Sequence, residues 1–228
     1  MAVTINGTTG IDTPSLTADT TTLVVDETNN RVGIGTASPT KPLHIYGNTS
    51  NNHQIRLQND FGSGADWTLN AYGANGTLYV GNTADRLVID SAGRVTMPYQ
   101  PAFVVGRTSS YWTSTGTMDF NQTFLNRGNH WDDTNNKFVA PVDGTYIFTF
   151  SGDWDNSGGS IAYPNLQKNG SSVGAIYNGD VGGSQKWVSN TWLVDLSAND
   201  EITIYNSVSV RWDYWSIPVV QLNGYLLG

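Results

Sequence analysis

Turn-forming residues recur at short intervals through the second half of the sequence, and they restrict the fold more than any other feature. The turn candidates are Asp143-Gly144, Lys168-Asn-Gly170, Ser197-Ala-Asn-Asp200 and Asn223-Gly224. Gly and Asn tolerate the backbone conformations that tight turns require, so each cluster ends one short strand and begins the next. The spacing predicts about ten strands over about 130 residues, which is typical of a sandwich or jelly roll.

The apolar stretches between these turns are short and alternate, as expected for strands. The strand candidates are Ala102–Val105, Met118–Phe120, Lys137–Val139, Thr145–Phe150, Ile161–Gln167, Val173–Tyr177, Trp187–Leu196, Glu201–Tyr205 and Val219–Leu227. We expect Phe138, Tyr146, Phe148 and Phe150 to point inward. The last stretch is apolar enough to be a central strand.

The amino-acid composition favours an all-β chain with a real core. Thr, Asn, Ser and 25 Gly outnumber the good helix formers, while 38% of the 228 residues are hydrophobic. The absence of Cys excludes disulfides and cysteine metal sites.

The distribution of aromatic residues divides the chain near Pro98. Five of the 26 aromatic residues precede this point and 21 follow it. Only residues 99–228 therefore carry the bulky side chains of a thick core. We expect three parts, at residues 1–20, 21–98 and 99–228.

The first part contains a duplicated segment. Thr22–Ile34 aligns without gaps on Thr77–Ile89, and each copy reads as a strand, a polar turn and a return strand. A third unit, Leu87–Met97, has its turn at Ser91-Ala-Gly93. Such short hairpins bury little apolar area, so we expect identical chains to cover one another's edges about a common axis. A monomeric hairpin array or a flexible stalk is the alternative.

Part of this region resembles bacteriophage tail-fibre and virion-fibre proteins. The resemblance rests on Asn30-Arg-Val-Gly-Ile-Gly-Thr-Ala-Ser-Pro39, on Lys41-Pro-Leu-His-Ile45 and on Asp90-Ser-Ala-Gly-Arg-Val95. It implies that residues 1–20 attach the chain to other virion proteins and that residues 21–98 form a hairpin-repeat shaft.

Residues 99–228 resemble the globular heads of complement C1q-like proteins. The matching segments are Phe120-Asn121, Asn126–Asp132, Lys137-Phe138, Pro141–Phe148, Leu166–Gly170, Leu196–Asp200 and Leu222–Leu227. The resemblance implies a ten-stranded jelly roll shared with tumour-necrosis-factor ligands, and a homotrimer. The chain lacks both cysteine and the Gly-X-Y repeat of a collagen stem, which disfavours an animal immune role.

Charge and hydropathy exclude several partners and locations. The net charge of −8, with Lys and Arg scattered, argues against nucleic acid and anionic membranes as partners. The start Met1-Ala-Val-Thr-Ile-Asn6 lacks the pattern of a signal peptide, and no stretch approaches the ~20 apolar residues of a membrane span. We expect assembly in the host cytoplasm, followed by action outside the cell as part of the virion.

The resemblance places three connections at the end of the head opposite the chain termini, at residues 152–160, 179–187 and 206–217. Trp and Tyr stack on sugar faces, and nearby Asp and Arg bind hydroxyl groups. The predicted receptor-binding residues are Trp154, Asp155, Asp180, Lys186, Arg211, Trp212, Asp213, Tyr214 and Trp215. The alternative is that Trp212 and Trp215 pack inward or against a neighbouring subunit.

Metal binding and catalysis find less support. Asp153-Trp-Asp-Asn-Ser-Gly158 matches the opening of a calcium loop, but Pro164 stands where the closing Glu belongs. We therefore predict no cofactor, with Asp153 and Asp155 as the ligands if a calcium ion does bind. His44, His53 and His130 have no Ser or carboxylate partner that the sequence can place, so we predict that the protein is not an enzyme.

These observations together predict a homotrimeric phage virion fibre. Its distal head would bind a host cell-surface receptor, a glycan or a protein, without catalysis, and several heads would act together by multivalency. The alternative is a purely structural capsid or tail fibre or adaptor, in which the head only clamps three chains together.

Overall fold

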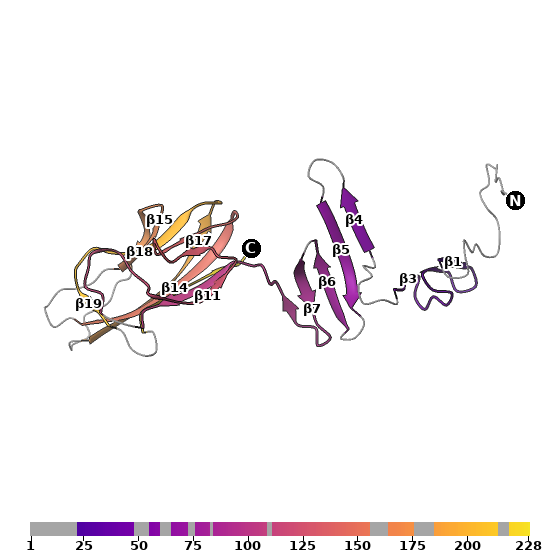
Figure 1. Cartoon of the computed structure of the whole chain (residues 1–228), viewed down its shortest axis with the longest axis horizontal. Coiled ribbons are helices and arrows are strands. Elements are labelled where there is room, and N and C mark those ends of the chain that lie inside the picture. The colour runs from indigo at the N-terminus through magenta and orange to yellow at the C-terminus, as the bar shows by residue number, and fades with distance from the viewer. Residues whose placement is uncertain are drawn as a thin grey trace. The chain divides into compact units, whose positions relative to one another are not determined.

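The chain contains two compact units in a computed structural model, residues 1–98 and residues 99–228. The structure describes residues 22–47, 55–59, 65–72, 76–82, 84–108, 111–155, 164–175, 185–213 and 219–228. All regular structure within these ranges is β-strand, as the sequence predicts (Figure 1). Among the same residues, no helix exists that could span a membrane.

The duplicated segments of the first unit form hairpins with the same register. Strand β1 (Leu23–Asp26) pairs with β2 (Arg31–Ile34), and β6 (Thr77–Gly81) pairs with β7 (Asp85–Ile89). Leu23 lies opposite Ile34 in the first hairpin, and the aligned residues Leu78 and Ile89 lie opposite each other in the second. The second copy differs by a register shift at its turn. The predicted hairpins are therefore correct in both position and pairing.

Each hairpin of the first unit belongs to a larger sheet. Strand β3 (Leu43–Ile45) adds to β2 in parallel to complete a three-stranded sheet. The second sheet is an antiparallel meander in the order β4-β5-β6-β7-β8, which adds β4 (Ile55–Asn59), β5 (Ala65–Tyr72) and β8 (Val95–Thr96). The β7–β8 hairpin is the predicted third unit, whereas β3, β4 and β5 are strands that the sequence patterns did not predict.

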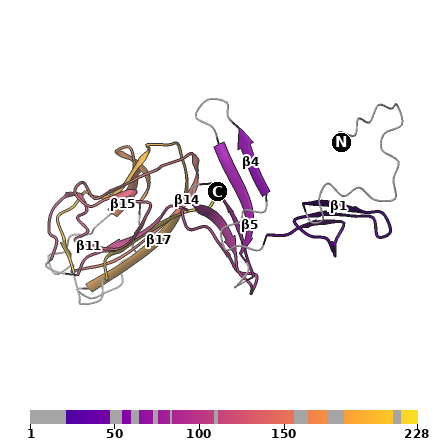
Figure 2. The same ribbon diagram turned by 45° about the vertical axis from the view of Figure 1, so that its right-hand side comes forward.

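The second unit is a sandwich of two antiparallel sheets. One sheet has the order β11-β9-β20-β14-β17, with β19 paired to β14. Its strands are β9 (Ala102–Gly106), β11 (Gln122–Arg127), β14 (Gly144–Asp155), β17 (Gln185–Leu196), β19 (Arg211–Trp212) and β20 (Gln221–Leu226). Figure 2 shows β14 and β17 running side by side along the sandwich. Strand β20 is central, as predicted for the apolar stretch that ends at Leu227.

The opposing sheet has the order β12-β13-β18-β15-β16, with β10 paired to β18. Its strands are β10 (Gly116–Thr117), β12 (Trp131–Asp132), β13 (Lys137–Val139), β15 (Pro164–Lys168), β16 (Ser171–Ala175) and β18 (Glu201–Asn206). With β10 and β19 each sheet has six strands, so the described residues of the second unit form twelve strands where about ten are predicted. Met118–Phe120 is not a strand, whereas β10, β11, β12 and β19 are strands that the sequence patterns missed.

The core between the two sheets is rich in aromatic rings. Tyr146, Phe148 and Phe150 alternate along β14 and are fully buried, as expected, and Phe138 joins them from the opposing sheet. The ring of Phe103 stacks on that of Phe138 at a centroid distance of 5.1 Å. Large aromatic side chains bury much apolar area each, so these inward residues contribute to the stability of the unit.

Two predicted turns have different outcomes. Asn169 and Gly170 join β15 to β16 with φ angles of 51° and 77°, as a tight hairpin turn requires. The prediction of a turn at Asn223-Gly224 is wrong, because both residues lie within β20. A Cβ atom at Gly224 would stand 2.2 Å from a ring carbon of Phe103, so glycine is needed there to admit the aromatic core and not to bend the chain.

The two ends of the sandwich are distinct. Tyr99 and Gly228 lie at the end that we call the base. There the side-chain amide of Gln100 donates a hydrogen bond to the Leu226 carbonyl at 2.6 Å, and the backbone N of Thr145 donates one to the Gly228 carbonyl at 2.8 Å. Strand β14 leaves the base and ends at Asp155, ten residues or ~33 Å beyond Thr145. We call that opposite end the distal end (Figure 1).

Candidate functional site

Strand pairing gathers the described members of the predicted receptor site at the distal end. Lys186 of β17 and Trp212 of β19 both lie opposite Trp154, and Arg211 lies opposite Asp155. Asp213 follows β19 directly, and its backbone N donates to the Asp153 carbonyl at 2.9 Å. Asp180, Tyr214 and Trp215 lie outside the described residues. The sites predicted from three separate segments therefore meet at one place.

The tryptophans do not have the surface position that was predicted. Trp154 is 1% exposed and Trp212 is fully buried, with their ring centroids 5.4 Å apart. The prediction placed both residues on connecting loops, but both lie in paired strands. Trp154 continues the inward alternation of Phe148 and Phe150, and Trp212 packs beside it. The interpretation that Trp212 packs inward is the one that the structure supports.

Lys186 also differs from the prediction, because its side chain is buried. It lies on the same side of β17 as Val188 and Trp192, which are both buried. Side chains two residues apart on a strand share a face, so Lys186 follows these neighbours into the sandwich. A cation in this position cannot be the surface contact that was predicted.

Four charged residues form a connected group on the outer face of the distal end, which we call the distal charged cluster: Asp153, Asp155, Arg211 and Asp213. Arg211 bridges two strands, with 2.7 Å from Nη2 to Asp155 Oδ2 and 3.2 Å from Nε to Asp213 Oδ1. Asp153 is fully buried within the group. Burial and the nearby carboxylates of Asp213 and Asp155 raise the pKa of Asp153 to about 6.

The exposed edge of this cluster combines cationic and aromatic groups. The Arg211 guanidinium lies over the ring of Tyr111, 4.4 Å from its centroid. Tyr111 is half exposed, and Trp187 on β17, opposite Asp153, is 58% exposed. Exposed aromatic faces beside fixed charges can stack on a ligand and bind its polar groups.

Sequence reasoning did not select Tyr111 or Trp187 as site residues. For Trp187 a signal was available, since it alternates with Lys186 and Val188 along a predicted strand. No sequence pattern indicates Tyr111 as a site residue. Its position depends on an isolated β-bridge between the next residue, Trp112, and Trp212, which is far away in sequence.

The two suggested calcium ligands lie in a strand, and the rest of the motif, residues 156–158, lies outside the described residues. Asp153 and Asp155 lie in β14, paired with β17 and β19, and not on a loop. The Asp155 carboxylate already pairs with Arg211. Within the ranges that the structure describes, no group of three His, Cys, Asp or Glu side chains could hold a metal ion.

The histidines are placed by packing and backbone contacts. His130 lies against Gly128, where an added Cβ would stand 2.4 Å from the imidazole Nε2, and burial lowers the pKa of His130. His44 Nδ1 accepts a hydrogen bond from Thr40 N at 3.3 Å. His53 lies outside the described residues.

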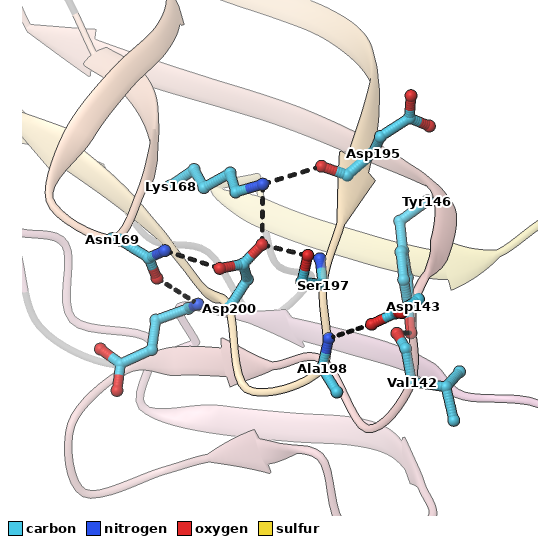
Figure 3. A network of polar contacts seen from close by, with 10 residues as sticks. Val142, Asp143, Tyr146, Lys168, Asn169, Asp195, Ser197, Ala198 and Asp200 are labelled. Atoms are coloured by element: carbon cyan, nitrogen blue, oxygen red, sulfur yellow. Dashed lines mark hydrogen bonds and ion pairs between the residues drawn. The ribbon is translucent and has the colours of Figure 1, made fainter.

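A second polar network lies at the base and has a structural role (Figure 3). The Asp200 carboxylate binds Lys168 Nζ at 2.7 Å, and it accepts hydrogen bonds from Asn169 Nδ2 at 2.7 Å and Ser197 N at 2.8 Å. These interactions lower the pKa of Asp200 to about 2. The hydrogen bond from Lys168 has the largest effect, followed by those from Asn169 and Ser197. The network joins the β15–β16 turn to the β17–β18 turn, so its charges stabilise the fold.

Comparisons with known proteins agree with the sandwich architecture. Residues 102–213, just under half of the chain, match the family model of the C1q domain. This match agrees with the C1q-like jelly roll that the resemblance of residues 99–228 predicts.

Two relatives by sequence are animal proteins. Complement C1q tumor necrosis factor-related protein 3 of Homo sapiens and that of Mus musculus are each 29% identical over 103 residues, which cover 45% of this chain. The chain spans only 42% of the length of each relative.

Similar solved structures include the globular domain of a zebrafish complement 1qA protein, at 17% identity and a TM-score of 0.46. That match covers 57% of this chain and 98% of the other. Murine APRIL at pH 5.0 matches at 10% identity and a TM-score of 0.47, covering 56% of this chain and 99% of the other.

Proposed function

We propose that the chain is a homotrimeric, non-catalytic fibre protein of a bacteriophage virion, and that its jelly-roll head binds a host surface receptor. Domains of the C1q and tumour-necrosis-factor type typically form homotrimers, which supports the assembly. The fibre assignment is supported by the hairpin repeats and by the motifs at residues 30–45 and 90–95 that resemble virion-fibre proteins. Residues 1–20 would attach the chain to other virion proteins.

The exposed part of the distal charged cluster carries the receptor proposal. Arg211 is held by two carboxylates and lies on Tyr111, so its guanidinium is already oriented before a ligand arrives. Pre-oriented groups lose little conformational entropy on binding. The half-exposed rings of Tyr111 and Trp187 add faces on which a sugar ring can stack.

Three heads on one fibre would strengthen a weak contact. Each head offers the same surface, and a cell-surface glycan repeats its own structure. A second contact then forms at high effective concentration, which raises the overall affinity without any new interaction. The proposed receptor class is therefore a repetitive glycan, with a surface protein as the second option.

A purely structural fibre is the alternative function. The burial of Trp154 and Trp212 favours it, because two of the predicted contact residues are used in the core. The ion pairs of Arg211 with Asp155 and Asp213 likewise satisfy charges within the chain. In this case the head would only hold three chains together.

Alanine substitutions at exposed residues separate the two functions. Tyr111→Ala and Trp187→Ala remove the aromatic faces without opening the core, and Leu193→Ala is a matched control on β17 because Leu193 is also exposed. The full-length proteins are labelled and tested for binding to host cells and to arrayed bacterial polysaccharides. Sedimentation velocity measures the trimer in parallel.

We expect Tyr111→Ala and Trp187→Ala each to weaken binding at least tenfold with the trimer intact, and Leu193→Ala to bind like the unchanged protein. Equal binding by all four proteins would refute the receptor surface and favour the structural function. A monomeric parent protein would refute the homotrimer itself.

A further inference from the structure

Four neighbouring chain segments place one row of side chains across the outer face of the distal end. Trp112 forms an antiparallel bridge with Trp212. Trp154 lies between Trp212 and Lys186 and opposite both of them. All four side chains are buried. Because successive residues of a strand face opposite sides of the sheet, the residues next to these four point outward.

The outward row, which we call the distal row, has four members: Tyr111, Asp213, Asp153 and Trp187. Trp187 lies directly opposite Asp153, and on the other side of Asp153 the backbone N of Asp213 donates to its carbonyl at 2.9 Å. Tyr111 and Asp213 adjoin the two residues of the antiparallel bridge, so they lie beside each other.

The distal row has exposed aromatic rings at its two ends and buried carboxylates between them. Trp187 and Tyr111 are half exposed or more, whereas Asp153 is fully buried and Asp213 is 5% exposed. Three strand spacings of about 4.8 Å separate the backbones that carry the two rings, which amounts to roughly 14 Å. A single sugar ring is smaller than this distance, so a ligand that stacks on both aromatic rings must be a chain of several sugar rings.

Arg211 supplies a polar contact between the two aromatic rings. Its Nε binds Asp213 at 3.2 Å and its Nη2 binds Asp155 at 2.7 Å, while the guanidinium lies over the ring of Tyr111. Within the described part of the chain, these contacts leave the N–H groups of Nη1 to donate to a ligand, and the side chain is 42% exposed. A guanidinium already held in this way loses little entropy when a sugar hydroxyl binds.

The charge at this end of the head disfavours an acidic ligand. The three carboxylates of the distal charged cluster outnumber the two nearby cations, Arg211 and the buried Lys186. Arg107, which follows β9, is paired with Asp119 at 2.9 Å. No Lys or Arg occurs in the sequence of the remaining segments of the head, residues 109–110, 156–163, 176–184 and 214–218. Buried charges are weakly screened by salt, so a carboxylate or phosphate on a ligand would be repelled.

We propose that the distal row binds an uncharged chain of sugar rings, which stacks on Trp187 at one end and on Tyr111 at the other. Arg211 Nη1 donates to a hydroxyl group of a sugar between them. This inference rests on the receptor-binding function proposed above, and it narrows the ligand to neutral glycans of several sugar rings. Glycans rich in carboxylate or phosphate groups are excluded by the carboxylates beneath the row.

Matched pairs of glycans test the charge preference of the full-length protein. Bacterial capsular polysaccharides that contain uronic acids are arrayed beside their carboxyl-reduced forms, in which each uronic acid has become a neutral hexose. Binding is measured at pH 8, where Asp153, whose pKa is raised to about 6, is ionised. Asp153→Asn removes one charge beneath the row. Asp195→Asn, the control, removes one charge opposite Thr145, eight residues or ~26 Å along β14 and beyond the reach of screened charges.

We expect the unchanged protein to bind at least one carboxyl-reduced polysaccharide at least tenfold more tightly than the acidic form of the same glycan. Asp153→Asn should reduce this preference at least threefold, because one repelling charge is removed, and Asp195→Asn should leave it unchanged. Equal or tighter binding of the acidic forms would overturn the inference and leave the receptor function in place. Failure to bind any polysaccharide on the array would overturn both the glycan receptor and this inference.

Fragments of the neutral polysaccharide that binds best test the two stacking positions by isothermal titration calorimetry. The affinity of the unchanged protein should rise at least tenfold from a disaccharide to an octasaccharide. Trp187→Ala and Tyr111→Ala should each abolish this rise, whereas Leu193→Ala, at an exposed position of β17, should keep it. Circular dichroism checks that each variant is folded. A disaccharide that binds as tightly as the octasaccharide would mean that one ring alone is used, which overturns the arrangement.

Discussion

Replacing Asp153 by Asn should change how the stability of the head depends on pH. Asp153 is fully buried beside Asp213 and Asp155, and burial is the largest reason that its pKa is raised to about 6 from an ordinary value of 3.8. The folded protein therefore holds a proton on this carboxyl that the unfolded chain has already released. Asn has nearly the same shape and does not titrate in this range.

The sign and size follow from the two pKa values. Between pH 3.8 and about 6 the folded state binds more protons than the unfolded state, so the free energy of unfolding falls as the pH rises. A difference of about 2 units corresponds to ~3 kcal/mol. The contribution of Asp153 is fully present below pH 3.8 and is lost once the pH exceeds about 6.

Denaturant unfolding at several pH values between 4 and 7 measures this effect. Tryptophan fluorescence reports on the head, and the chain concentration is held constant because association shifts apparent stability. We expect the stability of Asp153→Asn relative to the unchanged protein to rise by ~3 kcal/mol over this interval. Asp195→Asn on β17, where the side chain is exposed, is the control. Parallel stability curves for Asp153→Asn and the unchanged protein would refute the reasoning.

Three further substitutions test the packing and the base network. Trp212→Ala should lower the free energy of unfolding by ~3–5 kcal/mol, because it empties a buried site, and a change in urea midpoint equivalent to under ~1 kcal/mol would contradict that packing. Gly224→Ala should cost ~1–3 kcal/mol through overlap with the Phe103 ring, again measured by urea unfolding; an unchanged midpoint would mean that the ring can move away. Asp200→Asn should destabilise the head at neutral pH and remove the loss of stability that the unchanged protein shows as the pH falls from 3.8 through about 2, which acid unfolding followed by circular dichroism would detect.

Local patterns predicted much of the fold. The alternation of Tyr146, Phe148 and Phe150 identified the inward face of β14, and the repeated segment identified two hairpins with the same register. The same alternation carried four residues further would have placed Trp154 inside the core. The sequence pattern predicts a strand that ends at Phe150, whereas β14 continues to Asp155.

The candidate site was less predictable, because it depends on contacts between distant segments. The burial of Trp212 follows from its pairing with Trp154 of β14, almost 60 residues earlier, and no local pattern reports that pairing. Strands β4 and β5 were missed for a different reason. They lie among Gly and Asn residues typical of loops, and their alternation becomes informative only when the neighbouring strands are aligned.

The position of β20 in the middle of its sheet has a consequence for how the head folds. Strand β20 lies between β9 and β14, so the β9–β11 pair and the β14–β17 pair cannot join until it inserts. Its contacts with β9 close a loop of more than 100 residues, and pairings so distant in sequence form slowly. Until insertion, each pair exposes an open strand edge to other nascent chains. We therefore expect the yield of native head to fall with rising protein concentration during refolding, and chaperones that shield such edges to restore it.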